Sequence, residues 1–140
     1  MRWHVAADET GGALTVGEAW VRPGSEPPLH IHAREDETWY IIEGSVLFQR
    51  GVERIECGPG QSIVLPRGIP HGFAVQSQAA RILHIYTPGG LESAFESLSG
   101  PEPAPIVPAE AEAIFGDRGV TFVGPPLPVI LASERKQVAS

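Results

Sequence analysis

Short apolar or alternating runs, separated by glycine and proline, fill the chain from residue 14 to residue 87. Alternation places successive side chains on opposite faces of a strand, and many short strands divided by turn residues are typical of a β-sandwich or β-barrel. We therefore predict an all-β domain. The expected strands cover residues 14–21, 38–43, 45–50, 52–56, 62–65, 72–76 and 80–87, with a short extended piece at 29–33.

The pattern changes after Pro88. Leu91, Phe95 and Leu98 recur at intervals of three or four residues, as they do on one face of a helix. This spacing predicts a short amphipathic helix within residues 90–99.

The C-terminal part of the chain predicts one further helix. A proline-rich connector at 101–105 precedes residues 108–115, which carry proline and acidic residues in their first turn and are followed by Gly116. We expect a helix over 108–115. Residues 122–126 are expected to dock back on the barrel, and residues 133–140 to form a frayed polar tail.

The length of 140 residues suits one domain with its own hydrophobic core. We predict a single domain over residues 1–125, with a barrel core at about 13–88 and a helical segment at about 89–125. Residues 126–140 are expected to form a partly flexible tail.

The overall charge excludes some classes of partner. Seventeen acidic residues against ten basic ones give a formal net charge of −7, which opposes binding to nucleic-acid phosphates or to anionic lipid. The sequence shows no signal-peptide pattern and no apolar run of about 18 residues. The single Cys57 allows no intrachain disulfide. We expect a soluble cytoplasmic protein that binds neither nucleic acid nor membranes.

Histidines and a carboxylate supply the candidate chemistry. His30 and His32 share one face of an extended segment, and a strand that begins near Glu37 can aim its carboxylate at the same face. With His71, these residues make a metal site if the fold brings residue 71 beside residues 30–37. Glu35 has the parity of Glu37, but we prefer Glu37 because it belongs to the strand that follows.

The spacing of these residues resembles the paired signature motifs of the cupin superfamily. The first motif runs from Gly24 through His30, His32 and Glu37 to Gly44, and the second from Gly60 through Pro66-Arg67-Gly68 to His71. One position departs from the pattern, because Val75 stands where the second motif usually ends in asparagine. The departure removes no expected metal ligand.

The resemblance implies a fold and a cofactor. The fold would be a double-stranded β-helix, the cupin jelly-roll barrel, with the short C-terminal helices packed on it. The cofactor would be one divalent transition metal ion per chain, held by His30, His32, Glu37 and His71. Imidazole with carboxylate suits iron, nickel, copper, zinc or manganese. A homodimer is the assembly that the family favours.

The segment after Tyr86 is similar to that of small bacterial cupins related to quercetin 2,3-dioxygenase. This resemblance implies a metal-dependent dioxygenase that acts on a small aromatic or enolic substrate, with Glu37 as the catalytic base. Two alternatives stay open, because fold resemblance does not determine chemistry. One is a non-redox metal-dependent isomerase, cyclase or lyase, and the other is a small-molecule-binding cupin without catalysis.

Aromatic and histidine side chains near the expected metal are candidates for the substrate pocket. They are Trp39, Phe48, Phe73 and His84. In the strand over 80–87, residues 82, 84 and 86 share one face, and either face can point into the barrel. His84 lies near the metal only if its face points inward.

Overall fold

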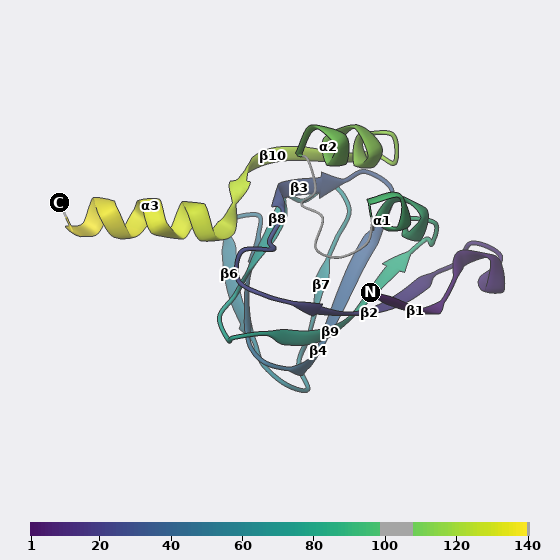
Figure 1. Cartoon of the computed structure of the whole chain (residues 1–140), viewed down its shortest axis with the longest axis horizontal. Coiled ribbons are helices and arrows are strands. Elements are labelled where there is room, and N and C mark those ends of the chain that lie inside the picture. The colour runs from purple at the N-terminus through teal and green to yellow at the C-terminus, as the bar shows by residue number, and fades with distance from the viewer. Residues whose placement is uncertain (99–107, 140) are drawn as a thin grey trace.

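Two antiparallel sheets dominate the computed structural model, which describes residues 1–98 and 108–139 (Figure 1). Within these residues each sheet has five strands. The first sheet has the order β1 (Arg2–Val5), β2 (Thr15–Val21), β9 (Ala80–Thr87), β4 (Asp36–Glu43) and β7 (Ser62–Leu65). The second has the order β10 (Val120–Pro126), β3 (Pro28–His32), β8 (His71–Val75), β5 (Val46–Arg50) and β6 (Glu53–Cys57). This confirms the predicted all-β, double-stranded β-helix fold.

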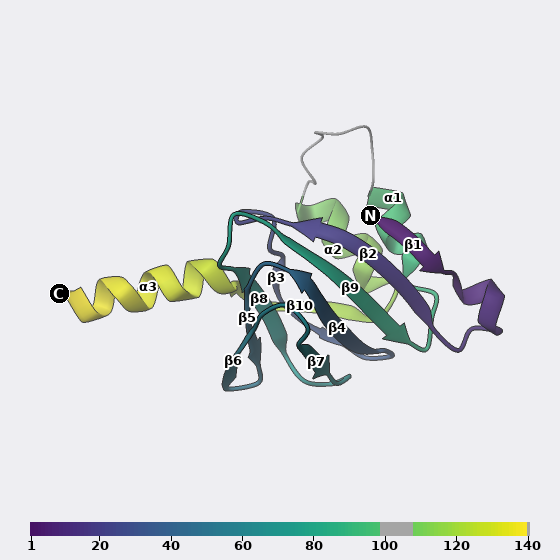
Figure 2. The same ribbon diagram turned by 90° about the horizontal axis from the view of Figure 1, so that it is seen from below.

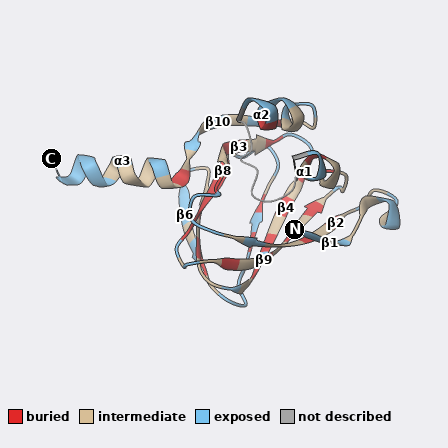
Figure 3. Cartoon of the chain, in the orientation of Figure 1, coloured by how far each residue is buried: buried red, intermediate tan, exposed pale blue. Residues whose placement is uncertain are grey.

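The main core lies between the two sheets, as the buried faces in Figure 3 show. On β4 the buried side chains alternate with more exposed ones, so that Trp39 and Ile41 point inward while Tyr40 points out. Strand β9 alternates in the same way over its whole length. Phe48 from β5 is fully buried against this layer. The period of two in the sequence is therefore the period of burial in the structure.

The predicted strands agree with the observed ones to within two residues at each end. The sequence analysis missed β1 and a 3-10 helix, η1 (Ala7–Thr10), and it did not identify β10 as a strand. Strand β1 lies outside the succession of short runs after residue 14 on which the strand predictions were based. It nonetheless extends the first sheet by pairing antiparallel with β2.

Helices α1 (Glu92–Leu98) and α2 (Pro108–Gly116) confirm the two helices expected after the barrel. The proline-rich connector at 101–105 lies outside the described residues. A second core of buried residues forms where these helices meet the sheets, and it contains Tyr86, Leu91, Ala94 and Val120. Residues 122–126 dock on the barrel as expected, because they belong to β10, which pairs with β3.

The frayed polar tail expected over 133–140 is wrong as far as Ala139. Residues Leu127–Ala139 form a third helix, α3, which extends away from the sheets (Figures 1 and 2). Leu127 anchors the start of this helix, since its side chain is fully buried. Sequence periodicity did not reveal the helix because its apolar residues do not form one clear stripe. No helix among the described residues is long and apolar enough to cross a membrane.

Candidate metal centre

Three strands from both sheets bring the four predicted ligands together. His30 and His32 lie on β3, and His71 on β8 is the direct cross-strand partner of His30. Glu37 comes from β4 in the other sheet. One ligand atom from each residue lies within 4.8 Å of the corresponding atom of every other. The predicted proximity of residue 71 to residues 30–37 is therefore confirmed.

The cluster is compact and shielded from solvent. Oε2 of Glu37 lies 3.4 Å from Nε2 of His32 and 3.2 Å from Nε2 of His71. The ring centroids of His30 and His71 are 4.4 Å apart. All four side chains are buried, with His30 the most exposed at 9%.

The orientation of the donor atoms fits a divalent transition metal. Nε2 of His32, Nε2 of His71 and Oε2 of Glu37 are buried without a hydrogen-bond partner. Nδ1 of His30 donates a hydrogen bond to the carbonyl oxygen of Pro28 over 2.8 Å. In the neutral ring Nε2 is then unprotonated, and its lone pair can bind a metal. Buried polar atoms without partners are costly, and a bound cation would satisfy them. The cluster can hold a metal ion with three nitrogens and one oxygen.

The imidazoles of the cluster differ in their affinity for protons. Burial lowers the pKa of His30 to about 4. Burial also opposes the charged form of His32, but the carboxylates of Glu35 and Glu37 outweigh it and raise the pKa of His32 to about 9. Burial likewise opposes ionisation of Glu37, yet its contacts with His32 and His71 hold the pKa of Glu37 well below its usual value. The metal-free site therefore holds an ionised carboxylate beside a protonated His32, and a metal must displace that proton.

The second oxygen of Glu37 is held by two donors. Nε1 of Trp39 donates to Oε1 of Glu37 over 2.5 Å, and the hydroxyl of Tyr86 donates to the same atom over 3.1 Å. These bonds direct Oε2 toward the histidines. Tyr86 was not among the predicted site residues. Its position on β9, two residues after His84 and on the same face, is the signal that could have found it.

The structure decides which face of β9 points inward. Ala80, Ile82, His84 and Tyr86 are buried, so His84 lies inside the barrel. Its Nδ1 lies 3.3 Å from the hydroxyl of Tyr86, and its ring stacks on Trp3 with a centroid separation of 5.4 Å. Burial lowers the pKa of His84 to about 4. His84 is thus a neutral imidazole that contacts Tyr86, which in turn donates a hydrogen bond to Glu37.

The other pocket candidates pack against one another. The ring of Trp39 contacts those of Phe48 and Phe73, with centroids 5.1 Å and 4.8 Å away, and all three residues are buried. They form an apolar wall behind Glu37. Their contact with a substrate stays a prediction, as does that of His84.

Glu35 occupies a different place from the four clustered residues. It is buried, and its Oε2 lies 3.5 Å from Nδ1 of His32, on the side of the ring away from Glu37. This position suits a group that orients His32 rather than a ligand. An open depression of about 120 Å³ lies beside Glu35 and is lined by Arg34, Glu35, Gly89, Gly90, Leu91 and Arg118.

Comparisons with known proteins place this geometry in context. The family model described as "Cupin domain" matches residues 18–86, which contain all four clustered residues. The chain is 28% identical over 113 residues to quercetin 2,3-dioxygenase of Bacillus subtilis, covering 81% of this chain. It spans only 34% of that relative's length.

Solved structures show the same fold at low identity. KdgF from Halomonas sp. has a TM-score of 0.55 at 20% identity, covering 59% of this chain and 74% of that one. An RmlC-like cupin from Shewanella frigidimarina has a TM-score of 0.53 at 20% identity, covering 59% of this chain and 72% of that one. At such identities the likeness concerns the fold alone.

Proposed function

Since this chain is a small cupin, with its cupin domain in residues 18–86, we propose that it is a metal-dependent dioxygenase acting on a small aromatic or enolic substrate. The observation that carries the proposal is the buried cluster of His30, His32, Glu37 and His71, whose ligand atoms converge. Nε2 of His32, Nε2 of His71 and Oε2 of Glu37 have no hydrogen-bond partner there. The similarity to a quercetin 2,3-dioxygenase supports the choice of chemistry.

The three histidines and Glu37 would hold the metal in this proposal. A bound iron, nickel, copper or manganese ion would supply open coordination positions for an ionised substrate hydroxyl and for dioxygen. His30 would be oriented by its bond to the Pro28 carbonyl, and His32 by the carboxylate of Glu35. Such outer contacts keep imidazole rings in a single orientation.

Glu37 is the proposed base, and its two carboxylate oxygens have different surroundings. Oε1 accepts hydrogen bonds from Trp39 and Tyr86. The indole N–H of Trp39 can only donate, so Oε1 stays an acceptor. Oε2 has no hydrogen-bond partner and faces the histidines. Oε2 is therefore the atom that would bind the metal, and it could accept the hydroxyl proton of a substrate when the carboxylate moves partly off the metal.

The surroundings favour a dry site. Trp39, Phe48 and Phe73 form an apolar wall behind Glu37, and such walls limit the access of water to reactive intermediates. The depression of about 120 Å³ beside Glu35 is lined by none of the four clustered residues. A substrate that entered there would need side chains to move before it reached the cluster.

The test compares metal content and oxygen consumption. Untagged protein is purified without chelator or added metal, beside His71→Ala and the control His4→Ala, and each is assayed by elemental analysis. His4 is a suitable control because it pairs with Glu18 outside the cluster. We expect a redox-active metal at near-stoichiometric level in the wild type and in His4→Ala, but not in His71→Ala.

Oxygen uptake is then measured with flavonols and with smaller enolic and aromatic compounds. Substrate-dependent uptake that is lost in His71→Ala supports the dioxygenase. Stoichiometric zinc with turnover in the absence of oxygen would favour a non-redox lyase, cyclase or isomerase instead. Saturable binding without any product would favour a binding module. Protein that neither carries nor takes up metal would overturn the metal site itself.

A further inference from the structure

Helix α3 extends from the body of the protein with little support (Figures 1 and 2). Its first residue, Leu127, is fully buried, and further along Glu134 forms two hydrogen bonds of 2.6 Å and 2.7 Å to the guanidinium of Arg54 on β6. Beyond that point the helix is exposed, and Val138 has 87% of its surface accessible. A helix of 13 residues is marginally stable in water without packing, so a partner surface would stabilise it.

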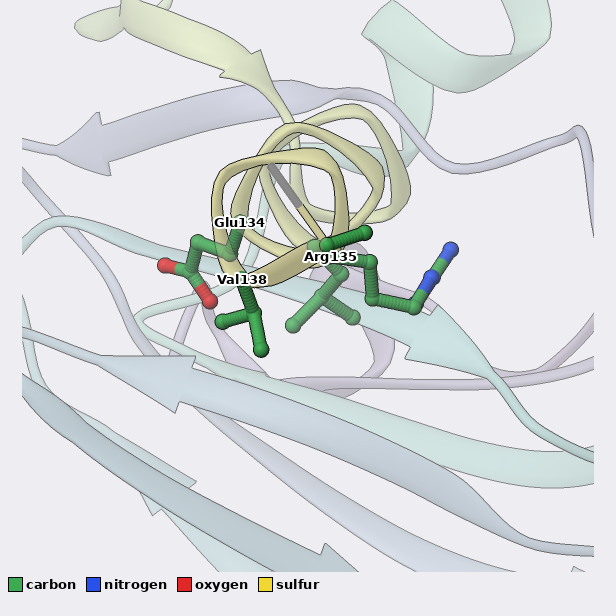
Figure 4. A pocket seen from close by; sticks show the side chains of 5 residues that line it. Glu134, Arg135 and Val138 are labelled. Carbon is green, nitrogen blue, oxygen red and sulfur yellow. The ribbon is translucent and has the colours of Figure 1, made fainter.

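One face of α3 lines an open depression. The depression, of about 390 Å³, is lined by Leu131, Glu134, Arg135, Val138 and Ala139, with the side chains arranged as in Figure 4. All of these residues belong to α3. Leu131 and Val138 are seven residues apart, or close to two helical turns, so they lie on the same face with the two charged residues between them. The opposite wall of the depression is missing.

The order of these residues is self-complementary. If two copies of α3 lie antiparallel about a two-fold axis between positions 134 and 135, Leu131 faces Val138 of the partner subunit. The same axis places Glu134 opposite Arg135 of the partner subunit. Each contact occurs twice, as a two-fold interface requires. We propose that α3 is the interface of a homodimer, paired antiparallel with α3 of a second copy of this chain.

The charges favour this arrangement. Arg135 has no ion-pair partner among the described residues, whereas Glu134 already binds Arg54. A carboxylate has about four lone-pair sites, so Glu134 can accept hydrogen bonds from a second guanidinium as well. At the centre of the interface each Glu134 carboxylate would then lie between two arginines, and a pair of Leu131 and Val138 would flank this centre at each end. A second copy supplies both the missing apolar wall and the missing counter-charge.

The test measures the molecular mass of the full chain by sedimentation equilibrium over about a hundredfold range of concentration, because a dimer dissociates on dilution. We expect a reversible dimer. Leu131→Glu and Val138→Glu should each raise its dissociation constant at least tenfold. The control is Val129→Glu, because Val129 is 54% exposed but lies about 180° around the helix from Val138. This control should leave the dissociation constant unchanged.

A charge exchange tests the antiparallel register. Arg135→Glu alone places two carboxylates opposite each other, and Glu134→Arg alone places two guanidinium groups opposite each other. Each variant should therefore dimerise weakly by itself. In an equimolar mixture the two variants restore both pairs between the subunits, and we expect a heterodimer that forms more tightly than either variant alone. Its affinity should stay below that of the wild type, because Glu134→Arg also loses the bonds to Arg54. Circular dichroism of each variant verifies that it remains folded.

Three results would overturn the proposal. They are a wild-type monomer throughout the concentration range, a dimer that is unaffected by Leu131→Glu and Val138→Glu, and charge variants whose mixture dimerises no better than either alone. The second result would indicate that the copies pair through another surface, such as a sheet edge.

Discussion

Glu37 on β4 and Tyr86 on β9 are cross-strand partners, and the hydroxyl of Tyr86 donates a 3.1 Å hydrogen bond to Oε1 of Glu37. This contact holds the carboxylate of the proposed metal site against the neighbouring strand of the same sheet. Both residues are buried, so water does not readily replace a lost bond. The orientation of Glu37 therefore depends on Tyr86 as well as on Trp39.

Tyr86→Phe should weaken metal binding without abolishing it. The variant keeps the ring but removes one of the two donors that hold Oε1 of Glu37. Loss of such an outer contact typically lowers metal affinity by about 10- to 100-fold. Competition with a chelating indicator dye measures the affinity. Tyr40→Phe is the matched control, because Tyr40 is 41% exposed on β4. Equal affinities for the two variants would contradict the positioning role of Tyr86.

Metal should stabilise the fold through Glu37. At a free metal concentration of about 100 times its dissociation constant, binding adds about 2.7 kcal/mol, which for a domain of this size corresponds to roughly 8 °C in Tm. Glu37→Gln should show little or none of this shift, because it lacks the anionic oxygen. Differential scanning fluorimetry after chelation and again after metal addition measures the effect. An equal shift in Glu37→Gln would show that the metal binds elsewhere.

The stability of the metal-free protein should fall between pH 7 and pH 5, in part because of His84. Burial lowers the pKa of His84 to about 4, below the value of about 6.5 in the unfolded chain. Between these values the unfolded state binds more protons, so stability is present above pH 6.5 and decreases as the pH falls toward 4. For His84 alone the loss is about 2 kcal/mol at pH 5.

His84→Asn separates this contribution from those of other groups. The variant should lose stability at pH 7, because it loses the stacking on Trp3, but its further loss at pH 5 should be smaller than that of the wild type. Urea unfolding of both chelated proteins at the two pH values measures the difference. His30 titrates in both proteins, so its contribution cancels. Parallel losses in the two proteins would argue against a neutral buried His84.

Gly17→Ala tests how tightly the interior is packed. A Cβ atom at Gly17 would lie 2.4 Å from Nε2 of His84 and 2.9 Å from Cζ3 of Trp3. Relieving such overlap in a packed interior typically costs about 1–3 kcal/mol. Gly58→Ala is the control, because the nearest atom to its Cβ is 3.8 Å away. Chemical denaturation gives both free energies of unfolding, and a Gly17→Ala variant as stable as the control would mean that the stacked rings move apart easily.

Much of the fold followed from local patterns. Alternation located most strands, because burial of one strand face has the same period in sequence and in structure. The close spacing of His30, His32 and Glu37 indicated that their side chains share one face. The motif that ends in His71 indicated that the chain comes back to place His71 beside them. The two helices after the barrel were visible from spacing and from the residues at their ends.

Other features depended on contacts between segments far apart in the sequence. Alternation left two choices for β9. The register of β9 against β4 pairs Tyr86 with Glu37 and so places both side chains on the inward face of the sheet. The bond from Tyr86 to Glu37 joins residues on separate strands, so no local pattern could reveal it. Helix α3 depends on the burial of Leu127 and on Arg54 of β6. The sequence by itself determined most of the strands and the set of candidate ligands, because these depend on periodicity and spacing. Tertiary structure decided which way the side chains of β9 point and which residues hold Glu37 in place, because these depend on which strands and helices pack together.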